Sequence, residues 1–350
     1  MITLENIRLV DPQGLWDKLC TFDEQLRDAV FETEDYKIDI DRNKIRDVVI
    51  TGMGGAIIGG ELIRAMCLEC GHLPVHVNKS YSLPSFVNDR TLVIAVSQSG
   101  NTEETLSSFE EAGARGAQRV IITTGGILAD MASEQQIPVI LLPKSRITRA
   151  ALAYSFTALW RVFQHLEVFQ PGNDELNGAA DFLEEQIEIL SGLEENIAIE
   201  MAADLKSTLP IIYSGDGLMA PVALRWKTQF HENAKVLAYC SHIPEMNHNE
   251  IEGWELTAHL MGKLSVIILQ DDSDHMRVRH RMDVTAQLIE PHSLTLKRVH
   301  SIGENVVQRV LFMILMGDFI SFYLAILSEV DPLPIEKIEL LKRRLNEIDV

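Results

Sequence analysis

The residues of this chain best suited to chemistry stand in one polar segment that follows an apolar run. The segment SQSGNTEET, residues 97–105, places the hydroxyls of Ser97, Ser99 and Thr102 around Gly100. A helical pattern comes next, and hydroxyls beside the amides of a helix N-terminus form a small phosphate cradle that needs little positive charge. Helix capping accounts for one such hydroxyl and not for three. The cluster therefore favours phosphate binding over capping alone.

A glycine-rich turn earlier in the chain offers a second set of backbone donors. Residues 52–60, GMGGAIIGG, join an apolar run to a helical pattern, so their amides can face an anion. The G-x-G-x-x-G pattern of dinucleotide-binding folds fails, because Ile57 stands where the third glycine belongs. No G-K-S/T motif for a nucleoside triphosphate is present either. The turn therefore faces another anion, or it serves only the fold.

Alternating apolar and amphipathic segments position these motifs. Short runs rich in Val and Ile are predicted as parallel strands covered on both faces; they are residues 46–53, 73–80, 91–99, 119–125 and 137–143. Helical patterns lie between them at 58–70, 103–116 and 128–136. Such alternation predicts an α/β fold with a doubly wound parallel sheet. Ligands bind such sheets at the carboxyl ends of the strands, where both motifs stand.

A second series of the same plan follows a helical stretch. Its predicted strands are residues 208–217, 236–243, 263–270 and 294–303, with helical patterns at 218–235 and 275–290. We therefore expect a helical lead-in over 1–45, a first α/β half over 46–150, connecting helices over 151–206, and a second α/β half with C-terminal helices over 207–350. Each half is expected to be an αβα sandwich.

The composition is that of a globular protein with an acidic surface. Of 350 residues, 46% are hydrophobic and 23% are charged, and the formal net charge is −20. This acidity argues against nucleic acid as a partner, because a protein that binds the phosphate backbone needs a surplus of Lys and Arg on one face. It leaves room for a small anion held by a few local donors.

One apolar stretch has the length of a membrane span. Residues 310–327 are interrupted by Asp318, and a carboxylate at the bilayer centre costs about 2.5–3.5 kcal/mol on insertion scales. We therefore expect this helix to be buried in a core or a subunit interface, and we expect no membrane association.

Cysteine usage and the N-terminus favour a cytoplasmic protein. The first residues lack the unbroken apolar core of a secretory signal. Cys67 and Cys70 have helical spacing and no second Cys or His pair that would complete a zinc site. Reduced thiols suit the cytosol.

The motifs together resemble a known domain. VSQSGNTEET after a glycine-rich first turn is similar to the sugar-isomerase (SIS) domain. The segment ENAKVLAYCSHIPEMNHNEIEGWE, residues 232–255, resembles the corresponding part of bifunctional phosphoglucose/phosphomannose isomerases, as do RAALAYS (149–155) and VDPLPIEKIELLKRRL (330–345). The resemblance spans about residues 45–345 in order.

The resemblance implies two SIS-type halves and an isomerase that needs neither metal nor cofactor. Such an enzyme interconverts glucose 6-phosphate, and also mannose 6-phosphate, with fructose 6-phosphate through a cis-enediol. The implied substrate-binding residues are Gly54, Gly55, Ser97, Ser99, Asn101 and Thr102. Moving a proton between C1 and C2 requires a base, an acid/base that opens the sugar ring, and positive charge near the enediolate.

The same resemblance supplies a candidate for each catalytic role. Glu232 is the implied base, at the end of a helical segment that would hold it rigid. His248 is the implied ring opener, since an imidazole titrates near working pH; family members take this histidine from the neighbouring subunit, which implies a homodimer. Arg149, permanently charged, would stabilise the enediolate. Lys342 matches the C-terminal lysine placed near the sugar, and a merely solvated lysine is an equal alternative there.

The chain also departs from the family pattern. Ala56 stands where a serine is usual, Gln98 where an aromatic residue is common, and Thr148 where proline is common. One missing hydroxyl weakens phosphate binding by about 0.5–1.5 kcal/mol. Two alternatives stay open: a non-catalytic regulator that binds a phosphosugar, and an SIS isomerase of another sugar phosphate, such as an amino sugar or a pentose.

Overall fold

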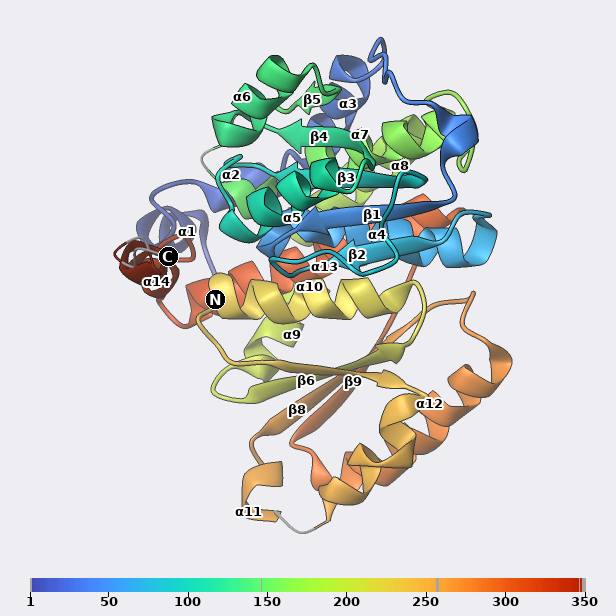
Figure 1. The fold of residues 1–350 in the computed structure, drawn as a ribbon. Coiled ribbons are helices and arrows are strands. Elements are labelled where there is room, and N and C mark those ends of the chain that lie inside the picture. Colours follow the sequence, from blue (N-terminus) through green and yellow to red (C-terminus); the bar gives the residue numbers. More distant parts are fainter. Residues whose placement is uncertain (1, 146, 256–257, 346, 348–350) are drawn as a thin grey trace.

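Two parallel sheets organise the chain (Figure 1). The computed structural model describes residues 2–145, 147–255, 258–345 and 347. The first sheet has the strand order β2-β1-β3-β4-β5 and the second β7-β6-β8-β9. All neighbouring strands are parallel. The prediction of two doubly wound α/β halves is therefore confirmed.

The first half contains every predicted strand. Its strands are β1 (Asp47–Gly52), β2 (Val75–Asn78), β3 (Thr91–Ser97), β4 (Gln118–Thr123) and β5 (Val139–Leu141), and its helices are α4 (Gly54–Cys70), α5 (Glu103–Ala114) and α6 (Gly126–Gln135). Helix α4 begins at Gly54 rather than at residue 58, because the glycine-rich turn itself forms the first helical turn. It contains both Cys67 and Cys70, as their spacing predicts.

The second half repeats this plan. Its strands are β6 (Leu209–Gly215), β7 (Tyr239–Ile243), β8 (Leu264–Gln270) and β9 (Thr295–His300), with helices α10 (Met219–Glu232), α11 (Ala258–Met261) and α12 (Met276–Ile289). Two short 3-10 turns, η3 (Glu245–His248) and η4 (Glu250–Trp254), follow β7. All four predicted strands are present.

The remaining helices precede, connect and follow the two sheets. They are α1 (Leu4–Val10), α2 (Leu15–Leu19), α3 (Phe22–Glu32), α7 (Leu152–His165), α8 (Asp174–Ser191), α9 (Ile197–Leu205), α13 (Val306–Leu327) and α14 (Glu336–Leu345). The stretch predicted as connecting helices, 151–206, consists of the three separate helices α7, α8 and α9, and a 3-10 turn, η2 (Thr148–Ala150), directly precedes it. Figure 1 places α1 and α14 at the same end of the molecule.

Helix α13 lies at the centre of the fold. Among the described residues it is the one helix long and apolar enough to cross a membrane, and 94% of its most apolar window is buried. In Figure 1, α10 and α13 lie between the two sheets. One apolar cluster joins Ile50 of the first sheet, Ile212 of the second and most of α13. Residues 310–327 are therefore buried in the core of the chain, as predicted.

The helices α10 and α13 approach each other closely at a glycine. A Cβ atom built on Gly317 would lie 2.3 Å from Nε1 of Trp226. This indole nitrogen donates a hydrogen bond to the carbonyl of Met313 at 2.7 Å. The glycine therefore sets how near the two helices can come.

We predict that Gly317→Ala lowers the free energy of unfolding by about 1–3 kcal/mol, because overpacking a filled core forces side chains off their rotamers. Chemical denaturation measures the change. Gly178→Ala in α8 is the matched control, since nothing lies within 4 Å of a methyl group there. That control should raise stability by about 0.5–1 kcal/mol. Equal effects of both substitutions would contradict the close approach of α10 and α13.

Candidate active site

The three predicted hydroxyls form a cluster at the carboxyl end of β3. Oγ of Ser97 lies 2.9 Å from Oγ1 of Thr102, and the Gly100 amide donates to Ser97 Oγ at 3.2 Å. The Asn101 amide donates to Oγ of Ser99 at 3.2 Å. Thr102 is the N-cap of α5 and makes no side-chain capping bond. Capping therefore does not account for the Thr102 hydroxyl, which stays half-buried at the start of the helix.

The cluster is braced by the loop that follows β4. Gly100 has a φ of 68°, and a Cβ atom there would lie 1.8 Å from the carbonyl oxygen of Gly125. Only glycine fits this close approach. The side-chain oxygen of Asn101, a predicted ligand of the substrate, accepts a hydrogen bond from the Ile127 amide at 3.0 Å. That oxygen is thus committed to holding the loop.

The glycine-rich turn lies at the same sheet edge. Strands β1 and β3 are paired, with Gly52 opposite Val96. Helix α4 begins at Gly54, and its N-cap residue, Met53, makes no side-chain capping bond. The first amides of a helix have no partner within it. Those of Gly54 and Gly55 are therefore available as donors, and their binding of an anion together with the hydroxyl cluster stays a prediction.

Arg149 connects this edge to the second half of the chain. A Cβ atom on Gly55 would lie 3.7 Å from Cα of Arg149, so the glycine-rich turn lies close to the backbone of Arg149. The Arg149 side chain is 7% exposed, and its Nη1 lies 3.6 Å from Oε2 of Glu232. Burial lowers the pKa of Arg149, and the charge of Glu232 opposes that shift. The structure thus brings together two of the predicted catalytic residues, although they lie far apart in the sequence.

A cavity of about 560 Å³ lies between the end of α10 and the C-terminal segment. Its polar lining residues are His231, Glu232, Lys235, Asp331, Glu336 and Lys337. Nζ of Lys235 donates to the carbonyl of Glu232 and, at 2.9 Å, to that of Pro332. Burial lowers the pKa of Lys235, and the nearby charge of Arg149 acts in the same direction. Two lysines, Lys235 and Lys337, therefore line the same cavity as the predicted base.

Sequence reasoning missed both of these lysines. Lys235 belongs to the ENAK motif, so the motif contains the residue without indicating its role. Lys342 lies exposed on α14 and is not among the residues described as lining the cavity. Its proximity to the sugar stays a prediction, while Lys337, on the same helix, lines the cavity.

His248 lies at the other end of α10 from Glu232. It is exposed and ends the turn η3, directly after β7. The carboxyl end of β7 lies beside that of β6, with Ile243 opposite Gly215, next to the start of α10. A helix of 14 residues is about 21 Å long. Within one chain the structure therefore does not bring His248 to Glu232.

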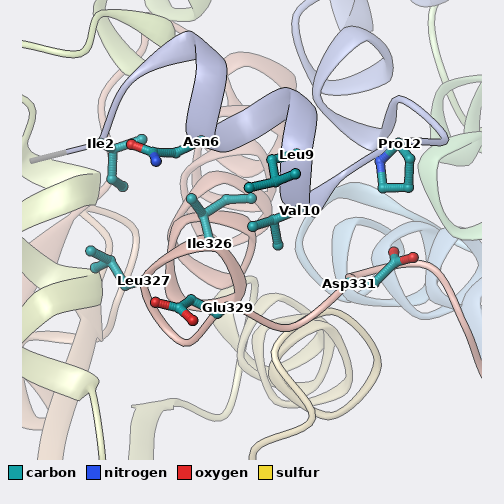
Figure 2. A pocket seen from close by; sticks show the side chains of 9 residues that line it. All are labelled: Ile2, Asn6, Leu9, Val10, Pro12, Ile326, Leu327, Glu329 and Asp331. Atoms are coloured by element: carbon teal, nitrogen blue, oxygen red, sulfur yellow. The ribbon is translucent and has the colours of Figure 1, made fainter.

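A different hollow, of about 630 Å³, lies between α1 and the end of α13 (Figure 2). Of the nine residues shown, the charged ones are Glu329 and Asp331, and the others are apolar or neutral. Two carboxylates without a basic residue do not suit a phosphate ester. Among the described residues, no three His, Cys, Asp or Glu side chains converge as metal ligands would; independence of metal stays a prediction.

Known proteins match this arrangement over both halves. Residues 43–164 match the SIS domain, and residues 194–345 match the bacterial phospho-glucose isomerase C-terminal SIS domain. A bifunctional phosphoglucose/phosphomannose isomerase of Caldicellulosiruptor bescii is 39% identical over 344 residues, which cover 95% of this chain and 99% of that protein. The chain belongs to the bifunctional phosphoglucose/phosphomannose isomerase family. A second member, from Aquifex aeolicus, is 35% identical over 91% of this chain and 95% of its own length.

Solved structures agree with the fold of this family. A glucose-6-phosphate isomerase-like protein from Thermus thermophilus covers 98% of this chain and 99% of its own, with a TM-score of 0.62 and 19% sequence identity. At that identity the likeness concerns the fold alone. The predicted resemblance to the isomerase family is confirmed by the sequence matches.

We predict that Thr102→Val weakens the binding of inorganic phosphate about 2- to 10-fold, because it removes one neutral hydrogen bond from the cradle while keeping the side-chain volume. Isothermal titration calorimetry measures the affinity. Ser107→Ala, on the exposed face of α5, is the control and should leave the affinity unchanged. If Thr102→Val binds phosphate as tightly as the unmodified protein, its hydroxyl is not part of the cradle.

Proposed function

We propose that this chain interconverts glucose 6-phosphate and mannose 6-phosphate with fructose 6-phosphate, without metal or cofactor. The observation that carries the proposal is the pairing of Arg149 with Glu232 at 3.6 Å, beside the glycine-rich turn. A base and a permanent cation in contact are what proton transfer through an enediolate requires. The names of the full-length relatives support the same substrates.

In the proposed mechanism the phosphate binds the amides of Gly54 and Gly55 and the hydroxyl cluster. The carboxylate of Glu232 removes the proton from C2 of the open-chain aldose and returns it to C1. The hydroxyl proton meanwhile passes from O2 to O1, so that no atom is gained or lost. The negative charge that develops on the enediolate lies near the guanidinium of Arg149, which stabilises it. Both C2 epimers give the same enediolate, which makes one site sufficient for both aldoses.

The proposal includes a homodimer in which His248 of one subunit serves the site of the other. Its support is the separation of His248 and Glu232 along α10, which keeps the implied ring opener away from the base of its own chain. The loop that carries His248 is itself well fixed. Glu250 accepts hydrogen bonds from the hydroxyls of Tyr213 at 2.6 Å and Tyr239 at 3.1 Å. An exposed histidine next to this fixed segment suits a residue that acts across an interface.

We also propose a cytoplasmic setting, within glycolysis or gluconeogenesis. The free thiols of Cys20 and Cys240 are compatible with a reducing compartment. Enzymes that act on phosphorylated sugars work in that compartment.

We predict that Glu232→Gln lowers kcat by about 10²- to 10⁴-fold, because the amide cannot accept the C2 proton. The affinity for fructose 6-phosphate should change little, since the phosphate contacts remain. A coupled assay and calorimetry measure the two quantities. Glu200→Gln, exposed on α9, is the control and should behave as the unmodified protein. Full activity of Glu232→Gln would remove this residue from the mechanism, and binding without turnover in the unmodified protein would favour a regulator.

A complementation experiment tests the shared site. Glu232→Gln and His248→Ala should each be inactive as homodimers. In a mixed dimer, one site combines the intact Glu232 of one subunit with the intact His248 of the other. After subunit exchange, activity should therefore recover to about a quarter of the normal value, because half the dimers are mixed and each has one intact site. No recovery from demonstrably mixed dimers would place both residues of a site in the same subunit.

A further inference from the structure

Two buried arginines lie side by side with different kinds of partner. Arg225 is 1% exposed and donates to both oxygens of Asp318, at 3.0 and 2.6 Å. Arg149 donates to neutral acceptors: Nε to Oδ1 of Asn233 at 2.7 Å, and Nη2 to the carbonyl of Pro332 at 2.5 Å. Arg225 is thus hydrogen-bonded to a carboxylate inside the protein, whereas, within the part of the chain that the structure describes, none of the hydrogen bonds of Arg149 goes to a carboxylate.

The remaining nitrogen of Arg149 faces the base. Nη1 lies 3.6 Å from Oε2 of Glu232, which is beyond hydrogen-bond distance. Among the described residues, Glu232 is the carboxylate within 4.0 Å of this guanidinium. Two sides of the guanidinium are therefore held by neutral groups, and the third is directed towards the site.

A polar patch on α13 fixes the orientation of Asn233. The Asn233 side chain is fully buried, and its Nδ2 donates to Oγ of Ser321 at 2.9 Å. Ser321 in turn donates to the carbonyl of Asp318 at 2.8 Å. Because Nδ2 is committed to Ser321, Oδ1 must face Arg149. Arg225 completes the arrangement by donating to the carbonyl of Arg149 at 2.9 Å.

We propose that Asn233 is a positioning residue that holds Arg149 in place while keeping its full positive charge for the enediolate. The inference rests on the proposed function, and it assigns a reason for asparagine at this position. An aspartate would accept the same hydrogen bond from Nε. It would also add a buried negative charge next to Arg149, and that charge would compete with the enediolate for the cation.

The chemistry of the reaction makes this role measurable. Negative charge at the sugar carbons exists only in the enediolate and in the transition states around it. An interaction specific to that charge lowers the barrier and contributes little to substrate binding. Loss of the free charge on Arg149 should therefore change kcat and leave KM nearly unchanged.

The test compares Asn233→Asp with Asn177→Asp, which adds the same charge on the exposed face of α8. Two ligands report on the site: 5-phosphoarabinonate, whose carboxylate resembles the enediolate, and glucitol 6-phosphate, which is uncharged at the same carbons. For Asn233→Asp we expect kcat and the affinity for 5-phosphoarabinonate each to fall on the order of 100-fold. KM and the affinity for glucitol 6-phosphate should change by less than about threefold. The control Asn177→Asp should change neither kcat nor KM nor the affinity for either ligand.

Equal losses of affinity for the two ligands in Asn233→Asp would reduce Asn233 to a structural role and overturn the proposal. Unchanged kcat in that variant would do the same. If thermal unfolding shows that Asn233→Asp does not fold, Ser321→Ala replaces it. This second variant frees the Asn233 amide without adding charge. It must then lower the affinity for 5-phosphoarabinonate more than the affinity for glucitol 6-phosphate. If the unmodified protein isomerises no hexose phosphate, the proposed function itself is overturned. That result differs from a failure of either variant, which overturns only the role of Asn233.

Discussion

The buried ion pair between Arg225 and Asp318 is the interaction on which the geometry of the site depends. Removing two charges from water costs several kcal/mol for each ion, and the pair regains this only when its hydrogen bonds are well formed. Both oxygens of Asp318 accept from Arg225. Burial raises the pKa of Asp318, and the charge of Arg225 opposes that shift. Because Arg225 also donates to the carbonyl of Arg149, the pair fixes α10, α13 and η2 relative to one another.

This network explains how two separate α/β halves form one site. The first half supplies the proposed donors for a phosphate, at the edge where β1 and β3 end. The second half supplies Glu232 at the end of α10, and the C-terminal segment supplies the carbonyls that hold Arg149 and Lys235. The core between the sheets is continuous and runs through α13. The distance from the proposed phosphate cradle to the proposed base is therefore set by helix packing and not by a flexible linker.

Much of the fold follows from local patterns. Every predicted strand is present. The central strands β1, β3, β6 and β8 are almost wholly buried, as their continuous apolar runs predict, whereas the edge strands β2, β7 and β9 are partly exposed. The predicted start of α4, residue 58, is too late. The glycines at 54 and 55 favour a loop in sequence terms, but in the structure they form the first turn of the helix. The hydroxyl cluster is likewise visible in the sequence, because its three members lie within six residues and share one strand end.

The contacts between distant segments are not visible in the same way. The pairing of Arg149 with Glu232 is expected only through the resemblance to a family. Periodicity shows that α13 is buried, but it does not reveal which group faces Asp318 from another helix. The same limit applies to the lysines. Position in the chain favours Lys342, whereas Lys235 and Lys337 line the cavity because of how α10 and α14 meet.

The most decisive experiment is the isomerisation of fructose 6-phosphate in D₂O, with a chelator present and the products followed by NMR. We expect both glucose 6-phosphate and mannose 6-phosphate, each with deuterium at C2, because the proton carried by Glu232 exchanges with solvent while the enediolate exists. Formation of neither aldose by folded, dimeric protein would contradict the conclusion that this site is a hexose-phosphate isomerase.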